Sequence, residues 1–480
     1  MKKYFLSICI LLFAFSVIAQ PKLEVGLKSE PDKVFPLEDG NYFFLNQSYI
    51  HIVNENLTKG SVYKMEPNYL YHFLDAYDNE TDIFSFFTYL DKKADTYGLY
   101  MDKYSKTGSK YKFSPQKITT IPLENKDKTK SFITSSLDGS KIAFSMILTD
   151  KKDIFKGIYT VVLNNSGEVL WQSARYMQFE NSTFYLHNMA VSNTGEVYFA
   201  SVSRNINTRG TSANSETCII ININENGHEM YSKVVDFGYV KDMKLKLLRN
   251  GKIFLAGYYS KEIKEHAIGL FTMTYDDDFS NMTTRPLGKF VDNTQGFNPI
   301  TGGVSNAACN LMCEEIYELE NGNIVLLGEL QHVVYYPGSG YNYLYHYKGV
   351  LYHRFSETGE ELYNHFIDKY QQYATNMPIP DHSLYRMGSF NSFQVNNDIY
   401  LVFNDNSSNY PKMPETPKPL LAGSIIKACT ILTKISIDNT VERKMVQKRS
   451  DTKETYHHLV YSDDKCAILR FTDNTRKLTF

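Results

Sequence analysis

The sequence predicts an all-β protein that folds as a single β-propeller of four-stranded blades. Three observations predict it: short apolar runs separated by tight-turn residues, a pattern of four such runs that recurs along the chain, and a high content of tyrosine (37) and phenylalanine (30). Aromatic residues suit the pleated, half-buried surface of a sheet. The chain length of 480 residues alone would suggest about three domains of roughly 150 residues each, but all-β folds often exceed that size as one domain.

Residues 186–235 show the repeating unit most clearly. A short apolar strand ends at the turn before Gly195, and a second strand follows it. After the polar loop 203–215 come the apolar run 218–221, a turn at Gly227 and a last strand. Four short strands joined in this way are typical of one propeller blade.

The first turn of the unit recurs along the chain. It is found at Gly139, Gly195, Gly251, Gly322, Asn397 and Asp463. The first two steps are 56 residues each, and the later steps are 71, 75 and 66 residues. The second turn falls at Gly167, Gly227 and Gly359, each followed four residues later by an aromatic residue: Trp171, Tyr231 and Tyr363. Asn-Gly and Asp-Gly turns between apolar runs are strong hairpin signals.

The number of units predicts the number of blades. Six complete units are visible, and the strands within 40–54 and 465–480 each make half a unit. Joined, the two halves would make a seventh blade that contains strands from both termini. We therefore expect seven blades, with eight as the alternative, because closing the ring removes the exposed sheet edges that invite aggregation.

Two stretches carry a family resemblance. Residues 321–328 and residues 165–171 each combine a glycine turn with an apolar strand. They resemble the WD40-like and quinoprotein-like repeats of secreted β-propeller proteins from Gram-negative bacteria. The resemblance implies how the blades pack. It implies no quinone or calcium site, since no ligand set for either is identifiable.

The N-terminus has the features of an export signal. Lys2 and Lys3 precede the apolar stretch 4–18, and Val17 and Ala19 suit a cleavage site before Gln20. The apolar stretch is shorter than the roughly 20 residues of a spanning helix, and no later stretch is apolar enough to span as a helix. We expect a signal peptide over 1–19, a propeller domain over 20–480, and a periplasmic, outer-membrane-associated or extracellular location.

Charge and cysteine content narrow the class of protein. The chain has 51 basic and 53 acidic residues, so nothing indicates a nucleic-acid partner. Five cysteines remain beyond the signal, an odd number that does not suggest a disulfide framework. Cys309 and Cys313 could form one local disulfide or remain buried thiols.

The long connections all belong to one face of the predicted propeller. Loops between the second and third strands, and loops between blades, lie opposite the tight turns. The long ones cover 203–215, 292–310, 331–345, 375–390 and 405–423. Long loops on a rigid scaffold often carry function, so we expect binding on this face.

Candidate binding residues come from these loops. Tyrosine offers a large, stiff contact surface with a polar tip, which suits glycan stacking or a protein interface. Arginines in a polar loop could contact an anionic partner, although solvation is the alternative. For the tyrosines the alternative is alternation within two strands, with half of the rings packed on the next blade. The candidates are Tyr335, Tyr336, Tyr341, Tyr343, Tyr345, Arg204, Arg209, Tyr385 and Arg386.

The sequence predicts no catalytic residue, metal site or cofactor. The Cys309–Cys313 spacing lacks the second pair of a zinc site. The acidic run 276–278 lacks the glycine and the later glutamate of a calcium loop.

Three functions remain open on the sequence alone. The first is a non-catalytic binding module of the cell envelope with a protein or glycan partner, as a monomer or as part of an envelope complex. The second is a carbohydrate-active hydrolase or lyase with its site at the channel mouth. An outer-membrane barrel is the third, and short, continuously apolar strands argue against it.

Overall fold

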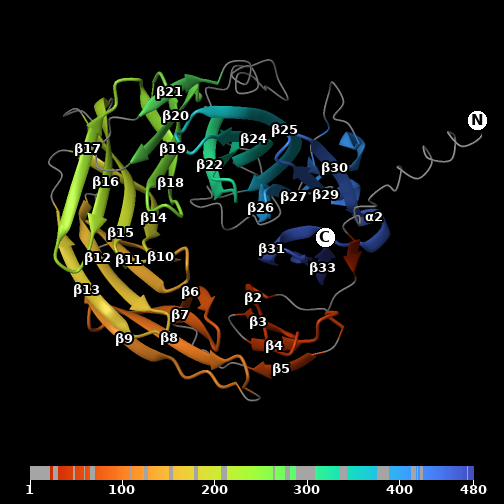
Figure 1. Cartoon of the computed structure of the whole chain (residues 1–480), viewed down its shortest axis with the longest axis horizontal. Coiled ribbons are helices and arrows are strands. Elements are labelled where there is room, and N and C mark those ends of the chain that lie inside the picture. The colour runs from red at the N-terminus through yellow and green to blue at the C-terminus, as the bar shows by residue number, and fades with distance from the viewer. Residues whose placement is uncertain are drawn as a thin grey trace, which may run out of the picture.

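Eight β-sheets form a closed ring around a central channel in the computed structural model (Figure 1). The structure describes residues 22–24, 31–46, 49–58, 60–64, 71–108, 111–123, 128–150, 155–177, 182–206, 213–262, 265–275, 282–287, 309–335, 343–375, 389–411, 418, 420–421, 425–472 and 474–480. The expected signal peptide, residues 1–19, lies outside these ranges.

Seven blades follow one another along the chain. Blade 1 is β2 (Lys33–Pro36), β3 (Tyr42–Asn46), β4 (Tyr49–Val53) and β5 (Gly60–Lys64), and blade 2 is β6 (Tyr71–Asp78), β7 (Asp82–Asp91), β8 (Thr96–Ser105) and β9 (Gln116–Pro122). Blade 3 is β10 (Lys128–Ser135), β11 (Lys141–Thr149), β12 (Phe155–Asn164) and β13 (Val169–Tyr176), and blade 4 is β14 (Ser182–Val191), β15 (Val197–Ile206), β16 (Ala213–Ile223) and β17 (His228–Val234). Blade 5 is β18 (Tyr239–Leu247), β19 (Ile253–Ser260), β20 (Gly269–Tyr275) and β21 (Thr283–Pro286).

The remaining three blades include the two that differ most from four consecutive strands: blade 6 has a fifth strand, and blade 8 combines strands from both termini. Blade 6 is β22 (Cys309–Glu318), β23 (Ile324–Tyr335), β24 (Tyr343–Phe355) and β25 (Glu361–Thr375), to which the short β28 (Leu420–Leu421) adds in parallel. Blade 7 is β26 (Phe390–Val395), β27 (Asp398–Asn406), β29 (Ala428–Ile435) and β30 (Val441–Lys448). Blade 8 is β31 (Tyr456–Ser462), β32 (Cys466–Phe471), β33 (Thr475–Thr479) and β1 (Lys22–Glu24).

The all-β propeller is confirmed, and the blade count is eight, the alternative that the sequence left open. Closure by both termini is confirmed as well, since β1 pairs with β33 through Lys22 and Thr479. The two half-units do not join, however. Residues 33–64 complete a blade of their own, because the short strands β2 and β5 flank the expected pair. Neither flanking strand has the long apolar run that marks the other blades.

Helical structure is scarce in the described part of the chain. It consists of α2 (Arg449–Thr452) and two 3-10 turns, η2 (Ser407–Asn409) and η3 (Ile425–Lys427). Within the described ranges, no helix has the length and apolar character needed to cross a membrane.

The core is divided among the contacts between adjacent blades. Each of the eight blade-to-blade interfaces holds its own cluster of buried apolar side chains. In the cluster between blades 5 and 6, for example, the rings of Phe254 and Phe355 lie 5.7 Å apart. A cluster also joins blade 8 to blade 1 through Ile468 and Phe44. Burial of apolar surface therefore closes the ring in addition to the strand pairing at β1.

The turns are where the glycine signals placed them. Gly139, Gly195, Gly251 and Gly322, at first turns, and Gly359, at a second turn, have φ between +67° and +93°. This left-handed region is open to glycine at little cost. These tight turns lie on one face, because every sheet alternates strand direction along the blade.

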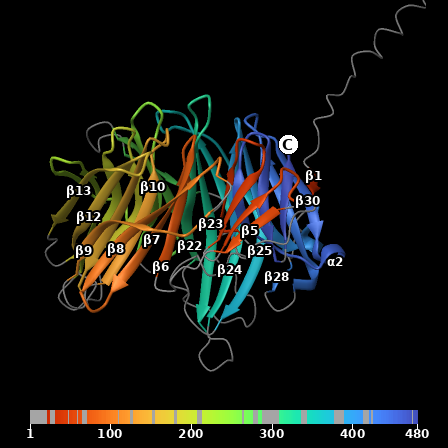
Figure 2. The same ribbon diagram turned by 90° about the horizontal axis from the view of Figure 1, so that it is seen from below.

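Blade 6 is lengthened toward the opposite face, which carries the longer connections. Its strands β23, β24 and β25 have 12, 13 and 15 residues. The inner strand β22 begins opposite His332, so residues 333–335 and their partners in β24 and β25 run past its end. Figure 2 shows these strands reaching toward the bottom of the view.

We expect Gly328→Ala to destabilise the fold. A Cβ at Gly328 in β23 would lie 2.1 Å from the hydroxyl oxygen of the fully buried Tyr258. Overpacking of a core typically costs about 1–3 kcal/mol, which would lower the denaturant midpoint in an equilibrium unfolding experiment. Gly227→Ala is the matched control, since a Cβ there meets nothing within 4 Å. Equal midpoints for the two variants would contradict the close contact.

Candidate functional site

Polar side chains gather on the inner strands at half the depth of the channel. Five of the inner strands contain one or two one-residue bulges. A bulge adds an unpaired residue and redirects side chains. The extra residues are Leu74, His187, Lys241 and Glu314, together with His457 and Val460 in β31, which has two bulges.

His187 and Asp242 form a bridge between blades 4 and 5. The distance from His187 Nδ1 to Asp242 Oδ1 is 2.8 Å, and each side chain is 14% exposed. In the neutral ring, Nδ1–H donates to the carboxylate and Nε2 becomes an acceptor. His187 Nε2 is buried and has no hydrogen-bond partner among the described residues.

Besides contacting His187, Asp242 accepts hydrogen bonds from two backbone N–H groups. Its Oδ1 accepts the Met243 N–H at 2.9 Å, and its Oδ2 accepts the Cys313 N–H of β22 at 2.8 Å. Its lone pairs are therefore largely committed to holding blade 5 against blade 6.

Glu314 is the bulge residue of β22 and lies deep in the channel wall, where solvent still reaches it. Its Oε1 accepts a hydrogen bond from Gln331 Nε2 at 3.3 Å. Burial, and then the charge of Glu329, raise the pKa of Glu314 to about 8, against the opposing charges of Lys244 and Lys369. A carboxyl with this pKa carries its proton at neutral pH and can donate a hydrogen bond.

Lys244 lies beside it on β18. Its Nζ donates to the Glu314 carbonyl oxygen and lies 3.3 Å from Glu315 Oε2. Lys244 therefore ties the inner strands of blades 5 and 6 together with a charge-assisted contact.

A fully buried ion pair lies behind the channel wall, within blade 6. Lys369 of β25 pairs with Glu329 of β23, and both side chains are 0% exposed. Lys369 Nζ also donates to Gln371 Oε1 at 2.9 Å, and Gln331 Nε2 donates to Glu329 Oε2 at 3.1 Å. Burial lowers the pKa of Lys369, while the charge of Glu329 opposes that shift.

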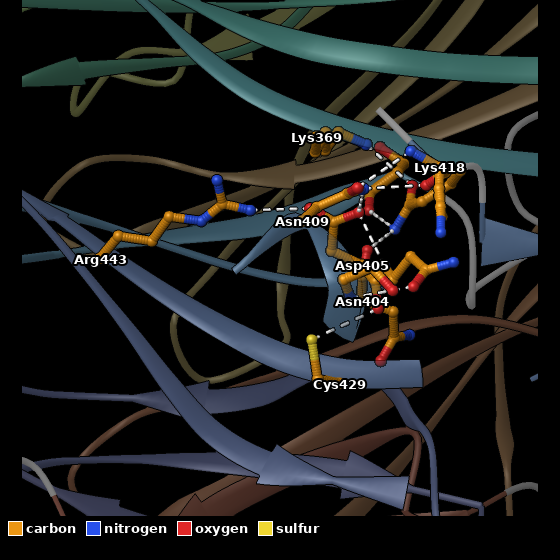
Figure 3. Close-up of polar contacts among 11 residues, drawn as sticks. Lys369, Asn404, Asp405, Asn409, Lys418, Cys429 and Arg443 are labelled. Atoms are coloured by element: carbon orange, nitrogen blue, oxygen red, sulfur yellow. Dashed lines mark hydrogen bonds and ion pairs between the residues drawn. The ribbon is translucent and has the colours of Figure 1, made fainter. Parts of the chain in front are cut away.

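The network continues from blade 6 into blade 7. Gln371 Nε2 donates to the carbonyl oxygen of Asn404 at 2.6 Å and to that of Ser389 at 3.2 Å. Asn404 Nδ2 in turn donates to the Tyr456 carbonyl oxygen at 2.6 Å, in blade 8. Figure 3 shows Lys369 and Asn404 on neighbouring elements of this network.

Asp405 anchors the long connection between β27 and β29. Arg443 donates to its Oδ2 at 2.7 Å, and Asn409 Nδ2 donates to its Oδ1 at 2.8 Å (Figure 3). Asn409 also exchanges two hydrogen bonds with the backbone of Lys418, at 2.9 and 3.0 Å. Since β28 pairs with β25 at Gln371, the connection is fastened both to blade 7 and to the lengthened blade 6.

Glu314 and Glu329 are two described carboxyl groups that lie close together, since Gln331 Nε2 donates to both, but Glu329 is 0% exposed and pairs with Lys369, so this pair does not suit the carbohydrate-active alternative. Glycosidases place two carboxyl groups about 5–9.5 Å apart on either side of the scissile bond. Asp242 accepts three hydrogen bonds, Glu329 is buried against Lys369, and Glu315 lies beside Lys244. Among the described residues, no group of three His, Cys, Asp or Glu side chains could hold a metal ion.

The thiols are structural in the described ranges. Cys218, Cys313, Cys429 and Cys466 are free, and burial raises the pKa of Cys218 to about 12, which leaves little reactive thiolate. The disulfide considered for Cys309 and Cys313 is wrong on geometry. Both residues lie on β22, so their Cα atoms are about 13 Å apart, whereas a disulfide needs about 4.4–6.8 Å.

The structure brings only part of the sequence-predicted set into view. Tyr335 and Tyr343 pair at the tip of β23 and β24, and their side chains are not among those described. Tyr345 is half-buried on β24. The rest of the set except Arg204 lies outside the described residues: Tyr336, Tyr341, Arg209, Tyr385 and Arg386.

Arg204 is placed on β15 and not in a loop. Its Nε pairs with the fully buried Glu216, and its terminal nitrogen donates to the Val240 carbonyl oxygen at 2.9 Å. The guanidinium also lies 4.6 Å from the centre of the Tyr185 ring. These contacts commit Arg204 to the packing of blade 4 on blade 5.

The buried polar network was not anticipated from the sequence. One signal was available, because Glu329 closely follows the apolar run 324–327 of its strand, and a charged residue is rarely buried without a partner. The partner, Lys369, is 40 residues further along the chain, and the residue pattern alone does not pair the two.

Comparisons with known proteins identify a general likeness of shape. No protein-family model matches the chain, and no curated protein matches it in sequence. Prolyl oligopeptidase B from Galerina marginata is similar over 91% of this chain, with 11% identity and a TM-score of 0.42, and the chain spans about half (54%) of that enzyme.

Two other solved structures are also similar. The β-propeller domain of the Trilobed protease from Pyrococcus furiosus matches over 90% of this chain and 97% of its own length, with 11% identity and a TM-score of 0.36. The Aleuria aurantia lectin, in complex with Fucalpha1-6GlcNAc, matches over 79% of this chain and 96% of its own length, with 8% identity and a TM-score of 0.29.

The raised pKa of Glu314 predicts a pH dependence of stability. Because the folded-state pKa of about 8 lies above the ordinary 4.5, the native state binds this proton more tightly than the unfolded state does. The contribution of Glu314 to stability is thus fully present below pH 4.5 and is lost as pH rises toward 8. We expect Glu314→Gln to fall less in unfolding free energy between pH 5 and 8 than the parent chain.

The measurement is urea unfolding across that pH range. Glu320→Gln, at the exposed tip of a tight turn, is the matched control and should keep the parent slope. A Glu314→Gln profile parallel to that of the parent would contradict a protonated Glu314.

Proposed function

We propose that this chain is a non-catalytic binding module that holds a protein partner on the face with the long loops, centred on blade 6. One observation carries the proposal: three strands of blade 6 run past the end of their own inner strand on that face. The projecting ribbon is joined by the connection between β27 and β29, which is fastened to it through β28.

The buried network beneath the ribbon supports this reading. Removing a carboxylate and an ammonium from water costs several kcal/mol per ion, and an apolar pair of similar volume is often as stable. The Glu329–Lys369 pair is therefore poorly explained by stability alone. It holds β23 and β25 in one arrangement, and a pre-organised surface loses less entropy on binding.

The shape of the region favours a protein over a glycan. Small ligands and sugars are usually held in concave sites, whereas the blade 6 ribbon projects from the ring (Figure 2). Tyrosines of the ribbon, including Tyr345, would supply the rigid aromatic contacts that dominate many protein interfaces. A protein of the cell envelope is the proposed partner.

The proposed location follows from the N-terminus. A signal peptide over residues 1–19 would deliver the propeller to the periplasm, the outer membrane or the exterior. We expect the mature protein to begin at Gln20, as measured by intact mass of the chain recovered from an envelope or culture-supernatant fraction. An uncleaved chain recovered from the cytoplasm would contradict export.

We expect the triple change Tyr341→Ala, Tyr343→Ala and Tyr345→Ala to weaken partner binding at least tenfold. Loss of an aromatic anchor commonly costs about 2 kcal/mol or more at an interface. The mature chain is immobilised, a retained envelope protein is purified, and its dissociation constant is measured against each variant by surface plasmon resonance.

Tyr176→Ala is the matched control. This tyrosine is 67% exposed on β13, the outer strand of blade 3, which is separated from blade 6 by blades 4 and 5 (Figure 1), and its loss should leave binding unchanged. Circular dichroism verifies that both variants fold. A partner that binds the triple variant as tightly as the parent would overturn the assignment to blade 6, and retention of a glycan in place of a protein would overturn the class of partner.

A further inference from the structure

A cavity of about 430 Å³ opens at the tight-turn end of the channel. Its walls come from the inner strands of four successive blades, 3 to 6, and from the turn that follows β10. Because inner strands run from the loop face toward the tight turns, the cavity lies at the opposite end of the channel from the blade 6 ribbon. The lining residues fall in the stretches 134–137, 188–191 and 244–247, with Glu315 added from β22.

The wall contributed by β18 carries two ammonium groups. Lys244 contacts β22 through Glu315 and the Glu314 backbone. Alternate residues of a strand share one face, so Lys246 lies on the same side as Lys244. Lys246 is partly exposed and has no ion-pair or hydrogen-bond partner among the described residues. Lys244 is thus paired with Glu315, whereas the ammonium group of Lys246 has no carboxylate partner among the described residues.

The facing walls carry neutral polar groups. Thr134 and Ser135 of β10 line the cavity, and Thr134 is the one that shares the strand face of Phe132, which packs toward blade 4. Asn188 lines the cavity from β14. The Asn188 Oδ1 already accepts the Leu245 N–H at 2.9 Å, so its NH₂ group is the end of that side chain left to donate. The cavity therefore combines ammonium groups on one side with the Thr134 hydroxyl and the Asn188 amide on the other.

We propose that this cavity binds a small hydroxylated carboxylic acid, such as a sugar acid. The carboxylate would accept charge-assisted hydrogen bonds from Lys246 and Lys244, and the hydroxyl groups would face Thr134 and Asn188. The volume lies within the range of about 300–1,000 Å³ that is usual for small-ligand sites.

The neighbouring carboxyl groups are compatible with an anion. Glu315 lies beside Lys244. The raised pKa of Glu314 keeps that side chain neutral at pH 7, so it adds no repulsion. Occupancy of this cavity does not depend on the function proposed for blade 6, because the two regions lie at opposite ends of the channel.

The test is isothermal titration calorimetry of the mature chain with glucuronate, glucose and acetate at low salt. We expect glucuronate to bind at least tenfold more tightly than either of the other two. Glucose lacks the carboxylate, and acetate lacks the hydroxyl groups. Lys246→Gln should weaken glucuronate binding about ten- to a hundredfold, the usual value of a hydrogen bond to a charged group, while Lys246→Arg should retain most of it.

Lys92→Gln, at an exposed turn of blade 2, is the control for loss of one positive charge and should bind glucuronate as the parent does. Absence of glucuronate binding to the folded parent chain would overturn the proposal. So would equal binding of glucose or acetate, or an unchanged affinity in Lys246→Gln.

Discussion

The inner strand of each blade has one edge without a neighbouring strand, and the rest of the structure depends on how that edge is satisfied. Buried backbone N–H groups must find partners, and here side chains of the adjacent blade supply several. Asn188 accepts the Leu245 N–H, Asp242 accepts the Cys313 N–H, and Asn391 accepts the Leu459 N–H at 3.1 Å. The belt of polar side chains in the channel therefore joins adjacent blades by hydrogen bonds to their inner strands. His187 and Glu314 lie within that belt.

The two ends of the channel differ in structure: one has tight turns and the cavity, and the other has the lengthened strands of blade 6. The connections at the first end are short turns, so the inner strands form most of the cavity wall there. At the other end the strands of blade 6 continue past the described part of β22. The Glu329–Lys369 pair and the hydrogen bonds of Gln371 to blade 7 hold these strands inside the protein. Replacing either residue of this pair would leave the other as an unpaired buried charge, which strongly destabilises a fold.

Local chemistry made much of the ring predictable, and the closing blades were the exception. Gly139, Gly195, Gly251 and Gly322 have the positive φ that their turn signals required. Blade 1 was not predicted as a separate blade because β5 is mostly exposed and has no apolar run that would indicate a strand. Blade 8 is completed by β1, a strand of three residues, whose pairing is set by the opposite terminus. Arg204 was expected in a loop, but Glu216, twelve positions away, holds it within the sheet.

By itself, the sequence determined the class of the protein and the position of its turns, because glycine conformation and the alternation of apolar residues act over a few neighbouring residues. It also placed the long connections on one face, since strand direction alternates within a blade. Only the tertiary structure decided the count of eight, the polar belt of the channel and the pairing of Glu329 with Lys369. Those features depend on which strands lie side by side once the ring has closed, and that arrangement joins residues far apart in the chain.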